Sequence, residues 1–170
     1  MKFVVRINVL AGKEDIVLNQ VEKLWKREHF SVKTICLLDE LYDIFLTADE
    51  EKVPFSVMHK IRKIQGVAGT EIMVLEEAFA EKGKAKGEAA LIFFDLEIGK
   101  EKSVIEALKK LCLEKEEILA FSGGYIFGMH RDLYLIAVVE DMHKFVKSVR
   151  QSIPGIVDTE WYHLRDFRNV

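Results

Sequence analysis

The chain has 170 residues, 49% of them hydrophobic and 31% charged, with a formal net charge of −3 and a pI near 6.0. This balance is typical of a globular protein and argues against binding to nucleic acid through bulk positive charge. No apolar run reaches the roughly 18 residues of a membrane span. The two cysteines, Cys36 and Cys112, form no Cys-x-x-Cys pair, which indicates reduced thiols in a cytoplasmic protein.

Hydrophobic periodicity predicts four strands and two helices in the first half of the chain. Apolar and β-branched runs predict the strands, and apolar residues near helical spacing predict the amphipathic helices. In chain order, the elements are a strand at 3–10, a helix at 13–30, strands at 32–38 and 41–48, a helix at 54–66 and a strand at 70–76. The predicted order is therefore βαββαβ.

Residues 78–88 are rich in Lys, Glu, Ala and Gly, which predicts a linker. The same order of elements then returns. It comprises a strand at 89–98, a helix at 103–113, hairpin strands at 117–127 and 132–139, a helix at 143–153 and a strand at 159–166. The predicted domains are therefore 1–77 and 89–170.

Two short motifs occur once in each half of the chain. Gly-Lys-Glu stands at 12–14 and 99–101, and Gly-Val/Ile-x-x-Thr-Glu stands at 66–71 and 155–160. Their nearly equal separation indicates an internal duplication. A βαββαβ unit is ferredoxin-like and carries both helices on one face of an antiparallel sheet. The predicted class is α+β, with two tandem ferredoxin-like repeats whose bare faces cover each other as a (pseudo)dimeric α+β barrel.

Strand alternation predicts which side chains face the helices and which face away from them. The rows predicted to face the helices are apolar: Phe3, Val5, Ile7 and Val9; Ile44, Leu46 and Ala48; Ile92, Phe94, Leu96 and Ile98; and Leu133, Leu135 and Ala137. Polar side chains are predicted on the opposite sheet faces. These candidate ligand-binding residues are Arg6, Asn8, Asp43, Asp95, Glu97 and Asp132. Charged groups on a covered face need partners, so one interpretation is an ion pair between Arg6 and Asp95 or Glu97. The other interpretation is a polar cavity that admits a small polar molecule.

Both repeats resemble the effector-binding and oligomerisation domain, also called the RAM domain, of the leucine-responsive regulator (Lrp/AsnC) family. The resemblance covers almost the whole chain. It rests on the x-Gly-Lys-Glu opening, on the hairpin that ends in Tyr42-Asp43, and on the closing Gly-Val-x-x-Thr-Glu motif. It implies dimeric α+β barrels that assemble further and bind amino-acid effectors near the hairpin loop, where Asp43 and Asp132 match the hairpin aspartate.

The chain departs from that family in three ways. It has no N-terminal helix-turn-helix, so no direct DNA binding is expected. The family's hairpin glycine is replaced by Glu40 in the first copy and Met129 in the second. The family normally has one such domain per chain, so the tandem copy implies an internal pseudo-dimer.

The sequence thus favours a non-enzymatic cytoplasmic regulator that binds an amino acid or similar effector, without a cofactor or metal. Homo-oligomers, or hetero-oligomers with Lrp/AsnC relatives, are expected partners, and no membrane is expected. One alternative is a dimeric α+β barrel enzyme or haem-binding protein, with His130 or His163 as the haem ligand, although the histidines lack metal-ligand spacing. The other alternative is a NusG-like transcription-associated module, because that domain shares the split βαβ order.

Overall fold

The computed structural model describes residues 2–29, 31–38, 41, 43–51, 55–78, 88–126 and 132–169. The βαββαβ order occurs twice, so the predicted α+β class with two tandem ferredoxin-like repeats is confirmed. The elements are β1 (Lys2–Val9), α1 (Glu14–Glu28), β2 (Val32–Leu38), β3 (Ile44–Asp49), α2 (Phe55–Arg62), β4 (Val67–Ala78), β5 (Glu88–Leu96), α3 (Glu101–Glu114), β6 (Ile118–Ile126), β7 (Leu133–Val139), α4 (Met142–Ser152) and β8 (Ile156–Asn169).

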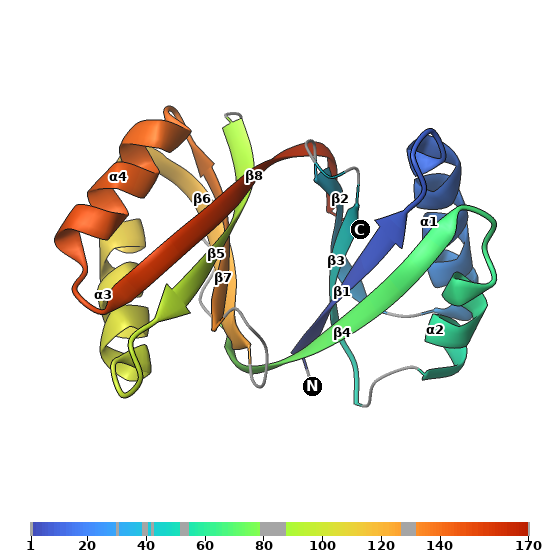
Figure 1. Cartoon of the computed structure of the whole chain (residues 1–170), viewed down its shortest axis with the longest axis horizontal. Coiled ribbons are helices and arrows are strands. Elements are labelled where there is room, and N and C mark those ends of the chain that lie inside the picture. Colours follow the sequence, from blue (N-terminus) through green and yellow to red (C-terminus); the bar gives the residue numbers. More distant parts are fainter. Residues whose placement is uncertain are drawn as a thin grey trace. The chain divides into compact units, whose positions relative to one another are not determined.

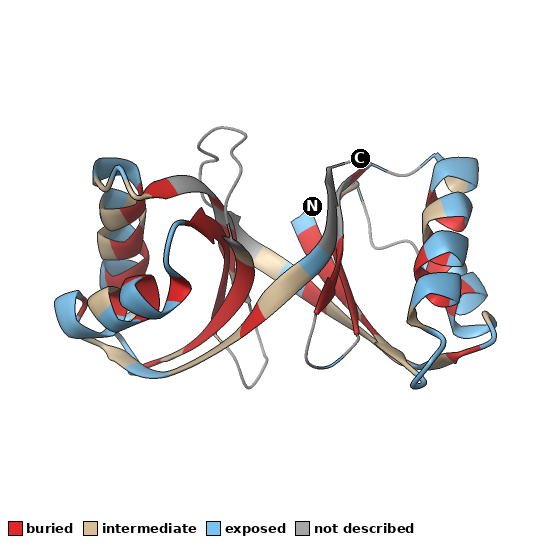
Figure 2. Ribbon diagram, turned by 90° about the horizontal axis from the view of Figure 1, so that it is seen from above, coloured by how far each residue is buried: buried red, intermediate tan, exposed pale blue. Residues whose placement is uncertain are grey.

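The chain divides into two compact units, unit 1 with residues 1–75 and 164–170, and unit 2 with residues 76–163. In unit 1, β3 pairs with β1 and β2, and β1 also pairs with β4. In unit 2, β7 pairs with β5 and β6, and β5 also pairs with β8. All these pairs are antiparallel. Within each unit both helices lie on the same face of the sheet (Figures 1 and 2).

Strand β8 is longer than the predicted strand at 159–166 and serves both units. Its first part pairs with β5, ending with His163 opposite Ala90. Its last part pairs with β2, beginning with Leu164 opposite Leu38. The repeat boundaries predicted from sequence, 1–77 and 89–170, stay a prediction. Residues 79–87 of the predicted linker lie outside the described residues.

Each unit has its own hydrophobic core between its sheet and its helices. The predicted helix-facing rows Phe3, Val5 and Ile7 and Ile44, Leu46 and Ala48 belong to the core of unit 1. The matching rows Ile92, Phe94 and Leu96 and Leu133, Leu135 and Ala137 belong to the core of unit 2. Ile98 was predicted in the same row, but β5 ends at Leu96 and the Ile98 side chain is 95% exposed.

The Gly-Lys-Glu motif begins the first helix of each repeat. Gly12 and Gly99 have φ angles of 80° and 85°, which a glycine adopts without steric cost. Glu14 Oε1 accepts a hydrogen bond from the Gly12 N–H at 2.9 Å, and Glu101 Oε1 accepts one from Gly99 at 3.1 Å. Together with its own backbone N–H, this bond holds the pKa of each carboxyl below its usual value. The motif therefore stabilises the start of each helix.

The closing motif packs against the opening motif, which explains why the two recur together. Gly66 has a φ of 103°, and a Cβ built on it would lie 2.8 Å from the Lys13 Cβ. Its carbonyl also accepts a hydrogen bond from the Leu10 N–H at 2.8 Å. Gly155 has the same relation to Lys100 and Glu97 in unit 2. The opening motif and the glycine that begins the closing motif are thus required by the βαββαβ unit itself.

Within the described ranges, no helix is both long enough and apolar enough to cross a membrane.

Candidate functional site

Three of the predicted site residues form one hydrogen-bonded cluster in unit 1. Asp43 Oδ2 accepts hydrogen bonds from Arg6 Nε at 3.1 Å, from Arg6 Nη2 at 3.0 Å and from Asn8 Nδ2 at 2.9 Å. Arg6 and Asn8 are two residues apart on β1, so they share the sheet face that lies away from α1 and α2. Asp95 and Glu97 were the partners predicted for Arg6, whereas the observed partner is Asp43 of the same repeat.

Arg6 is the cation of this cluster, and its side chain is still accessible to solvent. The Asp43 side chain is 8% exposed and that of Arg6 is 27% exposed. A carboxylate this buried is tolerated because Arg6, Asn8 and the Val9 backbone donate to it. A guanidinium has five N–H donors, and Asp43 engages only those on Nε and Nη2. Nη1 of Arg6 donates to no described residue.

Asp43 also has a structural role, which its counterpart Asp132 shares. The register of β1 shifts between Asn8 and Val9, and the Val9 N–H donates to Asp43 Oδ1 at 3.3 Å. The register of β5 shifts in the same way before Leu96, whose N–H donates to Asp132 Oδ2 at 2.8 Å. Each hairpin aspartate therefore satisfies the free N–H of a bulge.

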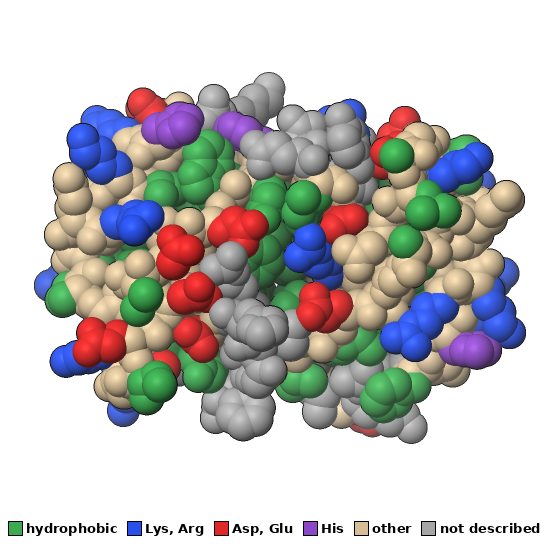
Figure 3. Space-filling model, in the orientation of Figure 1, with side chains coloured by type: hydrophobic (Ala, Val, Ile, Leu, Met, Phe, Trp, Pro, Cys, Tyr) green, Lys and Arg blue, Asp and Glu red, His purple; other side chains and the backbone are tan. Residues whose placement is uncertain are grey.

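The second repeat lacks the cation. Strand pairing places Phe93 and Asp95 where the first repeat has Arg6 and Asn8. Asp95 lies opposite Asp158, and Glu97 is exposed beyond the end of β5. Acidic side chains gather over β5 and β8 on the face shown in Figure 3. Asp132 belongs to the same unit and accepts a hydrogen bond from the Leu96 N–H next to Asp95. Ligand binding by the six predicted residues stays a prediction.

A row of four side chains crosses the sheet of unit 1 through Arg6. Cross-strand pairing places Cys36 opposite Phe45, Phe45 opposite Arg6, and Arg6 opposite Glu71. Cys36 is fully buried, its thiol lies 3.4 Å from the Phe45 carbonyl oxygen, and burial raises its pKa, so it is no nucleophile. Glu71 was not among the predicted site residues. It is the last residue of the repeated closing motif, a signal that could have identified it.

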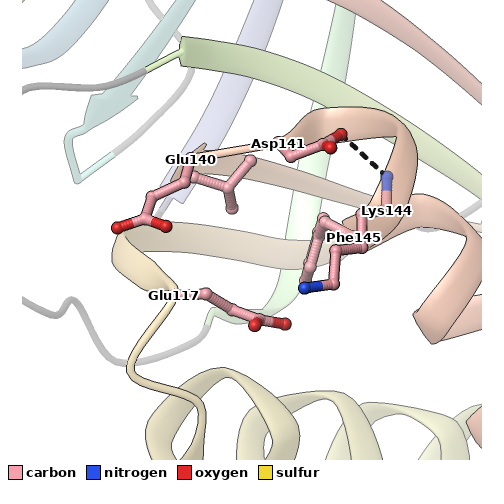
Figure 4. Close-up of a pocket in the computed structure, with 6 residues that line it drawn as sticks. Glu117, Glu140, Asp141, Lys144 and Phe145 are labelled. Atoms are coloured by element: carbon pink, nitrogen blue, oxygen red, sulfur yellow. Dashed lines mark hydrogen bonds between the residues drawn. The ribbon is translucent and has the colours of Figure 1, made fainter.

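A small cavity at the start of α4 does not form a substrate site. Its volume is about 40 Å³, and Glu117, Glu140, Asp141, Lys144 and Phe145 line it with Val139 (Figure 4). The Asp141 carboxylate caps the helix by accepting a hydrogen bond from the Lys144 N–H at 3.0 Å. Substrate and cofactor pockets usually measure several hundred Å³, so this space suits water.

His163 lies on the helix-covered face of unit 2. It pairs with Ala90, and its neighbour Trp161 pairs with Ile92, both of which belong to the core below α3 and α4. The Trp161 ring meets His163 and His143 edge-on, each with centroids 5.0 Å apart. No group of three or more His, Cys, Asp or Glu side chains within the described ranges could hold a metal ion. His130 lies outside the described residues.

No protein-family model matches the sequence, and no curated protein matches it. Solved structures do match. A presumed monooxygenase from Lactobacillus acidophilus NCFM is 10% identical with a TM-score of 0.66, covering 99% of this chain and 95% of its own. The siroheme decarboxylase NirDL is 6% identical with a TM-score of 0.67, covering 98% and 72%. A chlorite dismutase variant from Candidatus Nitrospira defluvii is 10% identical with a TM-score of 0.56, covering 96% and 90%. These likenesses support the predicted α+β barrel class.

The expected membership of the Lrp/AsnC family is wrong, and so is the non-enzymatic regulator derived from it. The structures that match over nearly the whole chain are described as enzymes. The physical reason is that the motifs behind the resemblance have structural roles. They stabilise helix starts, allow close packing at Gly66 and Gly155, and supply acceptors for the free N–H groups of the β-bulges. Amino-acid binding and assembly with Lrp/AsnC relatives lose their support with it. Oligomer formation and the cytoplasmic location stay predictions.

The placement of His163 does not fit a haem ligand. An axial ligand must point into a space wide enough for the macrocycle, whereas His163 packs edge-on against Trp161 below the helices. We therefore expect His163→Ala and the unchanged chain to give the same absorption spectrum when hemin is added. A Soret band that shifts with the unchanged chain and is lost in His163→Ala would contradict this placement. His143→Ala is the matched control, because it removes the other imidazole beside Trp161.

Proposed function

We propose that this chain is an α+β barrel enzyme that oxidises a small organic molecule and binds an anionic oxygen of that molecule at Arg6. The observation that carries the proposal is the guanidinium of Arg6, which Asp43 fixes through Nε and Nη2 while Nη1 has no described partner. A charged donor that is already oriented stabilises a developing oxyanion without first having to reorganise. The fold likeness to a presumed monooxygenase supports oxidative chemistry.

The surroundings of Arg6 favour an organic substrate. On the same sheet face, Val4, Phe45 and Met73 are buried and apolar. A planar, partly apolar molecule with one acidic oxygen would match a cation set among apolar side chains. Asn8 adds a side-chain amide beside the cation, and Asp43 holds its Nδ2. Haem is not part of the proposal, because His163 packs against Trp161 on the helix-covered face.

The proposal is tested by oxygen uptake with 1,8-dihydroxyanthrone, a carbon acid whose anion carries charge on oxygen. The unchanged chain should consume oxygen faster than buffer alone, with chelator present and no haem added. Arg6→Ala should lower kcat/KM by about 100-fold or more, the scale of losing one oxyanion donor. Arg6→Lys should recover only part of the rate, because an ammonium lacks the fork that Asp43 holds.

The matched control is Arg62→Ala, which removes an exposed arginine of unit 1 that donates to Thr70. It should leave oxygen uptake unchanged. Uptake at the spontaneous rate, identical for the unchanged chain and Arg6→Ala, would contradict the proposal.

A further inference from the structure

We infer that Glu71 is the general base of this site, and that the substrate is a weak carbon or oxygen acid whose conjugate base Arg6 holds. The inference rests on the proposed function and adds a residue, a substrate class and a proton-transfer step to it.

Glu71 stands beside Arg6 in the sheet. It lies on β4, directly opposite Arg6 in the β1–β4 ladder. Side chains opposite each other on antiparallel strands project from the same face, with Cβ atoms about 4.5–5.5 Å apart. The neighbouring residue Ile72 packs into the core on the helix side, so Glu71 projects to the other face, which carries Arg6 and Asn8.

The Glu71 carboxylate is not engaged by the described part of the chain. The guanidinium of Arg6 turns to Asp43, and no hydrogen bond or ion pair joins Glu71 to any described residue. Glu71 is only partly buried. A carboxylate beside a cation that another acid already neutralises can accept a proton without breaking an ion pair. It can therefore act as a base while Arg6 acts as the oxyanion donor.

The second repeat supplies an internal comparison. Glu160 occupies the position that corresponds to Glu71 and lies opposite Phe93 instead of an arginine. The acid is thus present in both repeats, and in the strand pairing it lies opposite an arginine in unit 1 and opposite a phenylalanine in unit 2. A base alone cannot stabilise the anion that it creates, so the step is assigned to unit 1.

The step is a simple proton transfer. A Glu71 carboxylate oxygen forms a bond to a proton of the substrate, and the C–H or O–H bond breaks. The electron pair of that bond remains on the substrate as an enolate or phenolate, whose oxygen accepts hydrogen bonds from Arg6. No oxidant takes part in this step. Phenols, hydroquinones and anthrones have acidic protons of this kind.

The test separates proton transfer from oxidation. Exchange of the carbon-bound proton of 1,8-dihydroxyanthrone is followed by proton NMR in deuterated buffer under nitrogen. The unchanged chain should accelerate exchange, and Glu71→Gln should lower that rate by about 100-fold or more, the usual contribution of a general base. Glu160→Gln, the matched control, should exchange at the parental rate.

A second variant guards against an effect on folding. Glu71→Ala should regain part of its exchange rate when formate is added, which a purely structural loss would not do. An unaltered exchange rate in Glu71→Gln, with oxygen uptake still dependent on Arg6, would overturn the role of Glu71 and leave the proposed function standing. If the unchanged chain accelerates neither proton exchange nor oxygen uptake that depends on Arg6, both the role of Glu71 and the proposed function would be overturned.

Discussion

Gly66→Ala is expected to lower the free energy of unfolding by about 3 kcal/mol. A φ of 103° is disfavoured for a residue with a Cβ, at a cost of about 1–2 kcal/mol. The new Cβ would also lie 2.8 Å from the Lys13 Cβ and 2.9 Å from Val17 Cγ2, and overpacking of this kind costs about 1–3 kcal/mol. The Lys13 Cβ is attached directly to the backbone at the start of α1, so it cannot move unless the helix shifts.

Urea denaturation followed by circular dichroism measures this loss, with Gly12→Ala as the matched control. Gly12 has a φ of 80°, but a Cβ there would meet nothing within 4 Å. It should therefore cost only the conformational part, about 1–2 kcal/mol. Equal losses in the two variants would show that the contact with Lys13 and Val17 contributes nothing.

Asp43→Ala is expected to destabilise the chain by about 3 kcal/mol, the lower end of the range for breaking a buried ion pair. The substitution removes the acceptor of Arg6, Asn8 and the Val9 N–H at once. Asp132→Ala removes a bulge acceptor without a cation beside it and should cost about 1–2 kcal/mol. Thermal and urea unfolding of the two variants measure the difference.

A double-mutant cycle separates the energy of the Arg6–Asp43 ion pair from that of the hydrogen bond between Asp43 and the bulge. With Arg6→Met in the same chain, Asp43→Ala no longer leaves an unpaired cation, so its additional cost should fall towards that of Asp132→Ala. Strict additivity of Arg6→Met and Asp43→Ala would contradict the coupling that the 3.0 Å contact implies.

The order of elements and the inward rows of each sheet could be predicted from sequence because they depend on local periodicity. Phe3, Val5 and Ile7 face the helices as expected. The partner of Arg6 could not be predicted in the same way. It depends on the register between β1 and β3, and α1 and β2 separate those strands in the chain. A shift of one residue in that register would place Asp43 on the opposite face.

The functional assignment went wrong for a related reason. A motif that occurs in both repeats indicates residues that each repeat needs in order to fold, such as Gly66 and Gly155. Residues that the repeats do not share, such as Arg6 against Phe93, are the better guide to chemistry. Glu71 illustrates the limit of this rule, since Glu160 repeats it and only the residue opposite distinguishes the two.

The two-part pairing of β8 has a consequence for biosynthesis. Residues 164–170 belong to unit 1, yet a ribosome makes them only after all of unit 2. Unit 1 therefore emerges early with the outer edge of β2 still unpaired. That edge pairs with the end of β8 only after some ninety further residues have been synthesised. A chain truncated before residue 164 would consequently leave unit 1 incomplete, although unit 1 is translated first. Its unpaired β2 edge could then pair with other chains.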